Sequence, residues 1–173
     1  MIFSADVIEE ISQDVSSNNR YINPSKIDGE IRVRLVGEGE SGYEAWTTDN
    51  KPVRWEKKPS ELPDNIRVNE DGRDPLRRFI AIAAWDYAAE EFKILSMTQK
   101  TLIQSLMHLI SDEDWGDPFE YDLKISRKGE GLGTEYKITP CPKKPISKQV
   151  MDAYDGLQVN LKAMFDNGDP FAV

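Results

Sequence analysis

Aromatic and basic side chains are interleaved in one part of the chain. Two tryptophans and four basic residues lie within thirteen positions, namely Trp46, Lys51, Arg54, Trp55, Lys57 and Lys58. Single-stranded nucleic acid is held by such a mixture, because aromatic rings stack on bases while cations follow the phosphates. Stacking contributes roughly 1–3 kcal/mol per base and tolerates any sequence, since every base has a π-face. These residue types indicate a nucleic-acid groove, although Trp46 and Trp55 also suit a hydrophobic core.

The same chemistry extends to neighbouring segments. Residues 30–36 alternate between polar and apolar side chains, which places Arg32 and Arg34 together on one face of a predicted strand. Trp85 lies in a segment that is apolar on both faces, so a core position and a stacking position both stay open. The predicted phosphate contacts are Arg32, Arg34, Lys51, Arg54, Lys93, Arg127 and Lys128, and the predicted stacking residues are Trp46, Trp55, Trp85 and Tyr136.

The elements that would position these residues follow a definite order. Residues 77–87 and 90–97 are typical of two strands around a tight turn, and residues 98–111 have helical apolar spacing with Thr98 as a cap. Residues 119–126 and 134–140 predict two more strands joined by a glycine-rich turn. A helix between the third and fourth strands of a five-stranded barrel is the connectivity of the OB-fold. We therefore expect a mainly β protein with helices, built on an OB-fold barrel.

The remaining segments predict extensions of this barrel. We expect the first strand to end at GEGESG, short strands at 43–47 and 51–56, and a long exposed loop at 57–76. A helix at 4–16 would pack on its own domain or dock on a neighbouring copy, and a second helix is expected at 148–165 before a flexible end. The expected divisions are an N-terminal helix and arm at 1–28, the OB-fold domain at 29–142, and a C-terminal helix and acidic tail at 143–173.

The charge is concentrated at the two ends of the chain. The formal net charge is −9, of which −6 lies in residues 1–50 and −3 in residues 149–173. A nucleic-acid footprint is usually basic, so the total charge argues against nucleic acid. The middle of the chain is neutral, and it can carry a basic groove if its acids lie on the opposite face.

Residues for enzymatic or metal chemistry are scarce. One histidine, His108, and one cysteine, Cys141, cannot supply the four ligands of a structural zinc site, and no catalytic signature surrounds His108. The acids between 112 and 122 lie in a loop beside helix breakers, and GEGLG lacks the lysine of a phosphate-binding loop. We therefore expect no enzyme and no cofactor. A lone cysteine, an acidic N-terminus and the absence of a long apolar run indicate a cytosolic protein.

A family resemblance adds to these patterns. Residues 121–136 read YDLKISRKGEGLGTEY, which resembles a strand-and-turn pattern of tailed-phage OB-fold single-stranded DNA-binding proteins. The segments YINP at 21–24, RVRL at 32–35, GYEAW at 42–46, KPVR at 51–54 and AWD at 84–86 resemble that family in the same order. The resemblance covers residues 21–140. It implies sequence-independent DNA binding that coats strands during phage replication and recombination, inside the bacterial host. Some relatives carry a core zinc site, for which this chain has no ligands.

The end of the chain is similar to a signal that recruits other proteins. Bacterial single-stranded DNA-binding proteins end in acids followed by Asp-hydrophobic-Pro-Phe, and this chain carries Asp166, Asp169, Pro170 and Phe171. The similarity implies that the tail binds replication or recombination proteins and competes with DNA for the groove. Self-association through the terminal helices is also expected. Two other functions stay open, a protein-binding OB module and a metal-dependent nuclease that uses the acids at 112–122.

Overall fold

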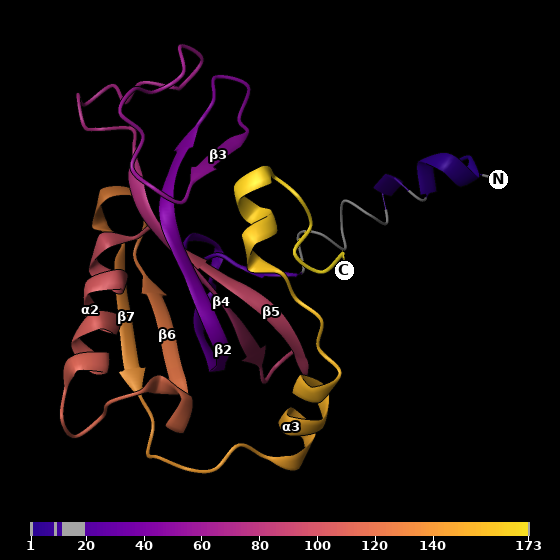
Figure 1. Ribbon diagram of the computed structural model, residues 1–173, viewed down its shortest axis with the longest axis vertical. Helices are drawn as coiled ribbons and strands as arrows, with labels where there is room; N and C mark the ends of the chain where they lie inside the picture. The colour runs from indigo at the N-terminus through magenta and orange to yellow at the C-terminus, as the bar shows by residue number, and fades with distance from the viewer. Residues whose placement is uncertain (1, 9, 12–19, 173) are drawn as a thin grey trace.

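A strongly curled mixed sheet dominates the structure. The computed structural model describes residues 2–8, 10–11 and 20–172. In these residues a half-barrel sheet, which does not close, is accompanied by a few short helices (Figure 1). Six strands follow the order β1-β5-β4-β2-β6-β7, and β3 pairs with β2 outside that path. The strands are β1 (Tyr21–Ile22), β2 (Gly29–Trp46), β3 (Pro52–Trp55), β4 (Arg77–Asp86), β5 (Glu91–Met97), β6 (Leu123–Lys128) and β7 (Glu135–Pro140).

The helices are short and lie at the edges of the sheet. Within residues 20–172 the α-helices are α2 (Lys100–Ser111) and α3 (Lys148–Asp155). The same residues contain four 3₁₀-helices, namely η1 (Pro24–Lys26), η2 (Pro118–Glu120), η3 (Gly131–Gly133) and η4 (Leu161–Asp166). No helix in the described part of the chain is long and apolar enough to cross a membrane.

The predicted strand-strand-helix-strand-strand order is confirmed. β4 and β5 form an antiparallel hairpin, α2 follows, and β6 and β7 form a second antiparallel hairpin. Thr98 is not the cap of α2, because Gln99 occupies that position without a side-chain hydrogen bond. The barrel that we expected is open, since β5 pairs in parallel with β1 and α2 packs beside β7.

β2 is longer than the sequence predicts. GEGESG does not end the strand, which runs for 18 residues from Gly29 to Trp46. An irregularity lies between Val36 and Glu40, where Gly37 has a φ of 71°, a conformation that glycine adopts without strain. The bulge bends the strand and lets it pair with β6 near its start and with β3 near its end. One strand therefore connects two distant parts of the sheet.

The main core fills the inside of the curl. Strand residues that face inward pack on the buried side of α2, where Leu102 and Leu106 lie. Ile110 belongs to the predicted apolar stripe but is 44% exposed. The buried strand residues of this core are Ile22, Val33, Leu35, Ala84, Leu95, Met97, Leu123 and Ile125.

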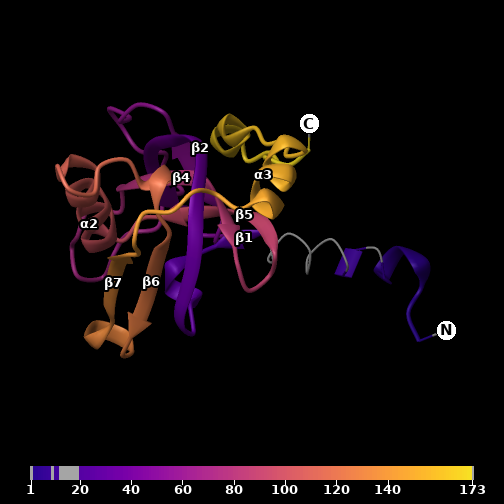
Figure 2. The same ribbon diagram turned by 90° about the horizontal axis from the view of Figure 1, so that it is seen from below.

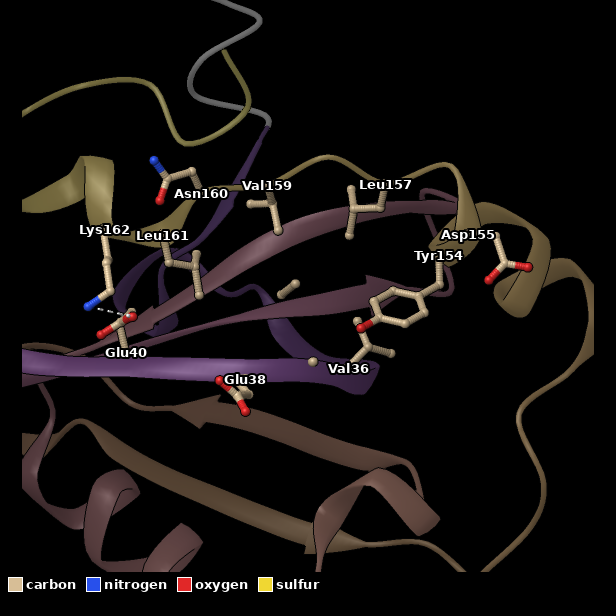
Figure 3. A pocket seen from close by; sticks show the side chains of 12 residues that line it. Val36, Glu38, Glu40, Tyr154, Asp155, Leu157, Val159, Asn160, Leu161 and Lys162 are labelled. Carbon is tan, nitrogen blue, oxygen red and sulfur yellow. Dashed lines mark ion pairs between the residues drawn. The ribbon is translucent and has the colours of Figure 1, made fainter. Parts of the chain in front are cut away.

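The C-terminal segment covers the outer face of β4 and β5. The single helix expected at 148–165 is not formed, because α3 ends at Asp155 before Gly156 and the chain then continues to η4. Leu161 and Met164 pack on Phe79 and Ile94 in a second core. Figure 3 shows this segment above β2, where Lys162 pairs with Glu40 at 3.4 Å. The expected flexible end is instead packed, since Pro170 is buried and Phe171 lies against this second core.

The described part of the N-terminal arm extends away from the sheet (Figures 1 and 2). Residues 5–8 and 10–11 are helical, and Val7, Ile8 and Ile11 are exposed. The rest of the helix expected at 4–16 lies outside the described residues.

Candidate nucleic-acid interface

The end of β2 forms a hairpin with β3, and β3 stands beyond the main core in Figure 1. Tyr43 of β2 lies opposite Trp55 of β3 and also opposite Arg78 of β4. These three side chains therefore share one face and form a row across three adjacent strands, which we call the hairpin row. The guanidinium of Arg78 lies 4.5 Å from the centre of the Tyr43 ring. Arg78 is exposed, and both aromatic rings are half-buried.

On the opposite face of the hairpin, a charged pair stabilises the strands. Glu44 lies opposite Arg54 and Arg77, and the Nε atom of Arg54 donates to its Oε2 atom at 2.8 Å. The Arg54 side chain is 16% exposed and lies over the Phe79 ring, which argues against the phosphate contact that we predicted for it. Its charge is already neutralised by Glu44.

Trp46 lies beyond Glu44 on this outer face. The residue is 39% exposed and lines a small cleft of 170 Å³ with Arg67 and Arg77. The backbone N–H of Arg67 donates to the Trp46 carbonyl at 2.8 Å, which fixes the long loop beside the strand. Lys51, in the turn of the hairpin, is exposed and lies 4.0 Å from Asp49. The predicted residues Trp46 and Lys51 are therefore exposed on the same hairpin as half-buried Trp55, with Trp46 and Trp55 on opposite faces.

Arg34 has a structural role that the sequence did not reveal. Its side chain is 1% exposed, and its Nε atom donates to fully buried Asp122 at 2.7 Å. Its other two nitrogens donate to the backbone carbonyls of Phe119 and Lys144. These bonds use all three guanidinium nitrogens inside the protein, which argues against the phosphate contact that we predicted for Arg34. Arg32 shares Asp122 at 2.8 Å but keeps 39% of its side chain exposed.

The buried carboxylate of Asp122 is held in its charged form. Burial acts to raise its pKa, but hydrogen bonds from Tyr87, Arg34 and Arg32 outweigh burial and lower the pKa below its ordinary value. The Tyr87 hydroxyl donates to Asp122 at 2.7 Å. Burial and this hydrogen bond raise the pKa of Tyr87 to about 12. The network joins β2, the β4–β5 turn and the segment before β6.

The structure argues against two further predicted contacts, because one residue is buried and the other is paired with an acid. Trp85 is 3% exposed and packs edge-on against Phe92, with ring centres 5.0 Å apart. This resolves the open choice in favour of the core. Lys93 is 16% exposed and pairs with Asp86 at 3.1 Å.

The three remaining candidates lie at the turn between β6 and β7. Arg127 lies opposite Tyr136, which packs partly on the main core, while Lys128 is exposed. Arg127 also lies opposite Gly29, at the start of β2, whereas the hairpin row lies near the end of that strand. The site residues that we predicted therefore do not form one continuous groove along the sheet.

Sequence reasoning missed Tyr43, Arg67, Arg77 and Arg78. The adjacent arginines Arg77 and Arg78, at the start of a strand beside the long loop, were the available signal. Alternation along the strand puts them on opposite faces, so each side of the hairpin receives one cation.

The other cavities differ in chemistry from the hairpin. The cavity of Figure 3 is lined by Glu38, Glu40 and Asp155 with a single cation, Lys162, which does not suit a phosphate. Among the described residues no group of three histidine, cysteine, aspartate or glutamate side chains is placed to hold a metal ion. No family model, curated protein or solved structure matches this chain.

Proposed function

We propose that this protein binds single-stranded DNA without strong sequence preference, through the hairpin row and through Trp46 on the opposite face of the same hairpin. The observation that carries the proposal is the arrangement of Trp55, Tyr43 and Arg78 as direct neighbours on three strands. Two rings followed by an exposed cation match a strand whose bases stack while a phosphate is neutralised. The hairpin projects from the sheet, so bases can approach it without displacing the main core.

The strand order supports an OB-fold relationship for the sheet. β2, β4, β5, α2, β6 and β7 follow the OB order of three strands, a helix and two strands. β2 pairs with both β4 and β6, as the first strand of that fold does. In this assignment the hairpin and long loop join the first two barrel strands, and this loop commonly contacts ligand in OB-folds. The family resemblance adds a biological setting, in which the protein coats strands during phage replication and recombination.

A fluorescence titration tests this function. A dT oligonucleotide of about 30 nucleotides, longer than the roughly 4–16 nucleotides that one OB-fold covers, is added at two salt concentrations. We expect quenching of tryptophan emission and weaker binding at the higher salt, because phosphate contacts release counterions. Absence of binding at low salt would contradict the proposal. A uridine oligonucleotide of equal length measures the preference for DNA, and shortening of the oligonucleotide in Mg²⁺ would instead favour the nuclease.

A second candidate function rests on an apolar groove between α2 and the sheet. The groove has a volume of 420 Å³ and is lined by Ile80, Ile82 and Leu106. Met107, Ile110 and Phe119 border it and are each more than a third exposed. This surface favours a protein-binding module in which a partner inserts apolar side chains. A Met107→Glu variant that binds DNA normally but loses a host or phage protein would support this role.

We also propose protein contacts for the two ends. At the C-terminus, the centre of the Phe171 ring lies 3.8 Å from the guanidinium carbon of Arg20, and a carboxylate oxygen of Asp169 lies 3.9 Å from a nitrogen of the same group. Binding of replication or recombination proteins through Asp166, Asp169, Pro170 and Phe171 would therefore detach an ordered end. At the N-terminus, exposed Ile8 and Ile11 suit self-association. Sedimentation of an Ile8→Glu variant beside the native chain tests that contact.

A further inference from the structure

One buried carboxylate is surrounded by an excess of positive charge. Asp122 is fully buried and lies 2.8 Å from Arg32, 2.7 Å from Arg34 and 3.3 Å from the Nζ atom of Lys144. Three cations on one carboxylate leave two positive charges uncompensated within the cluster. The Arg32 and Lys144 side chains are 39% and 50% exposed, so both present part of this charge to solvent.

The cluster continues onto the neighbouring strand. Lys124 of β6 lies directly opposite Arg32 of β2, and its neighbour on the other side is Thr139 of β7. Cross-strand neighbours point to the same face, and like charges placed opposite each other are destabilising. The carboxylate of Asp122 offsets part of this repulsion, but it also forms ion pairs with Arg34 and Lys144. An external anion would remove the remaining repulsion.

A cavity opens beside this cluster. It has a volume of 530 Å³ and is lined by Arg34, Lys143, Lys144, Phe119 and Glu120. Lys143 pairs with Glu120 at 3.2 Å, so the cavity keeps more positive than negative charge. The segment that joins β7 to α3 forms one wall, and Figure 2 shows it crossing over β6 and β2. Hydrogen bonds from Arg34 to the Lys144 carbonyl and from the Lys144 N–H to the Glu120 carbonyl fix that wall.

We propose that Arg32, Lys124 and Lys144 form a second phosphate-binding surface for the same DNA strand, which lies toward the start of β2 and on the opposite face of the sheet from the hairpin row. This inference rests on the proposed function. The surface differs from the hairpin row, because its neighbouring aromatic residue, Tyr87, is held by a hydrogen bond from its hydroxyl to buried Asp122. It therefore binds phosphates rather than bases, and it lengthens the footprint without adding sequence preference.

The test removes the two lysines, which are less embedded than the arginines. Lys124→Gln/Lys144→Gln is compared with Lys100→Gln/Lys148→Gln, a control that changes the net charge equally at the starts of α2 and α3. Affinity is measured over a range of salt concentrations for two dT oligonucleotides, of about 30 and about 6 nucleotides. These two lengths bracket the footprint of a single OB-fold. We expect the salt slope for the long oligonucleotide to fall by about 1.4, since each single-strand phosphate contact contributes about 0.7. Binding of the short oligonucleotide, and both slopes of the control, should not change.

The outcomes separate this surface from the proposed function. Normal binding by the native chain with an unchanged slope in the double variant overturns the second surface and leaves the function intact. A Lys124→Gln variant whose slope falls by about 0.7 supports the surface even if the double variant does not fold. In a separate titration, inorganic tripolyphosphate, which has phosphates but no bases, is added to the native chain. The NMR signals of Arg32 and Lys124 report its binding. Shifts of these signals without any oligonucleotide binding support an anion site and contradict the DNA function. Equal shifts with polyglutamate would overturn the assignment to phosphate.

Discussion

The guanidinium of Arg78 lies over the ring of Tyr43, 4.5 Å from its centre. A cation in this position is attracted by the ring, and it holds the aromatic side chain in a fixed orientation. Trp55 lies on the other side of Tyr43 in the same row. The pair therefore places a stacking surface and a positive charge next to each other before any ligand arrives, which lowers the conformational entropy lost on binding.

Removal of the central ring should weaken DNA binding. We expect Tyr43→Ala to reduce affinity for a dT oligonucleotide by about 1–3 kcal/mol, the usual contribution of one stacked base. Tyr43→Phe should retain most of the affinity because the ring remains. Tyr154→Ala is the matched control, since Tyr154 is an exposed aromatic residue on α3. Equal losses in Tyr43→Ala and Tyr154→Ala would show that the hairpin row is not the site.

Arg78 and Arg54 should respond differently to the same substitution. Arg78→Gln removes an exposed cation, so we expect weaker DNA binding and a salt slope lower by about 0.7. Arg54→Gln should reduce stability instead, because it leaves Glu44 mostly buried without its ion pair. Binding isotherms and thermal unfolding of both variants, with Arg73→Gln as an exposed-loop control, separate the effects. A loss of binding in folded Arg54→Gln alone would contradict these assignments.

The Asp122 network should make stability depend on acid. The pKa of Asp122 in the folded chain lies below its ordinary value of 3.8, so its charged form is stabilised by folding. This contribution is complete above 3.8 and is lost as the pH falls toward the lower folded pKa. Asp122→Asn should cost about 3–5 kcal/mol at neutral pH, because three cations lose their shared partner. Denaturant unfolding between neutral and acid pH should show a smaller acid dependence in the variant than in the native chain.

The charges of the tail should oppose DNA binding. Asp166→Asn/Asp169→Asn keeps Pro170 and Phe171 packed while it removes two exposed acids. We expect affinity for dT oligonucleotides to rise by about 0.2–1 kcal/mol at low salt, the range of exposed charge interactions, and the gain to shrink as salt is added. Asp152→Asn/Asp155→Asn on α3 is the control for net charge. Equal gains in both variants would indicate a general charge effect and no competition by the tail.

Local pattern was sufficient for the strands and helix between Arg77 and Pro140. Alternating β-branched and aromatic residues, interrupted by turns, specify those elements without distant contacts. The continuity of β2 was not predictable in this way, because GEGESG has the composition of a loop and is extended only through its pairing with β4. The end of α3 was visible in Gly156, whereas the packing of the tail depends on Phe79 and Ile94, far away in the sequence.

The sequence pointed to the segment that carries the candidate site, but it identified only some of the residues that the structure brings together there. Trp46, Lys51 and Trp55 are accessible because the hairpin stands beyond the core. Arg34 looked identical to Arg32 in an alternating strand, and its burial depends on Asp122, which lies 88 residues further along the chain. Alternation identifies a face, but it does not say which acid or backbone carbonyl covers that face. Arg78 became a candidate only when the register placed it opposite Tyr43.

The central claim is that single-stranded DNA lies on the hairpin row, and photo-crosslinking tests it most directly. A dT oligonucleotide with 5-iodouracil at successive positions is irradiated with the native chain, and crosslinked peptides are identified by mass spectrometry. The account predicts crosslinks at Tyr43, Trp46 or Trp55 that disappear when excess unlabelled dT is added. Crosslinks confined to other parts of the sheet, or their absence under conditions where the oligonucleotide is bound, would contradict it.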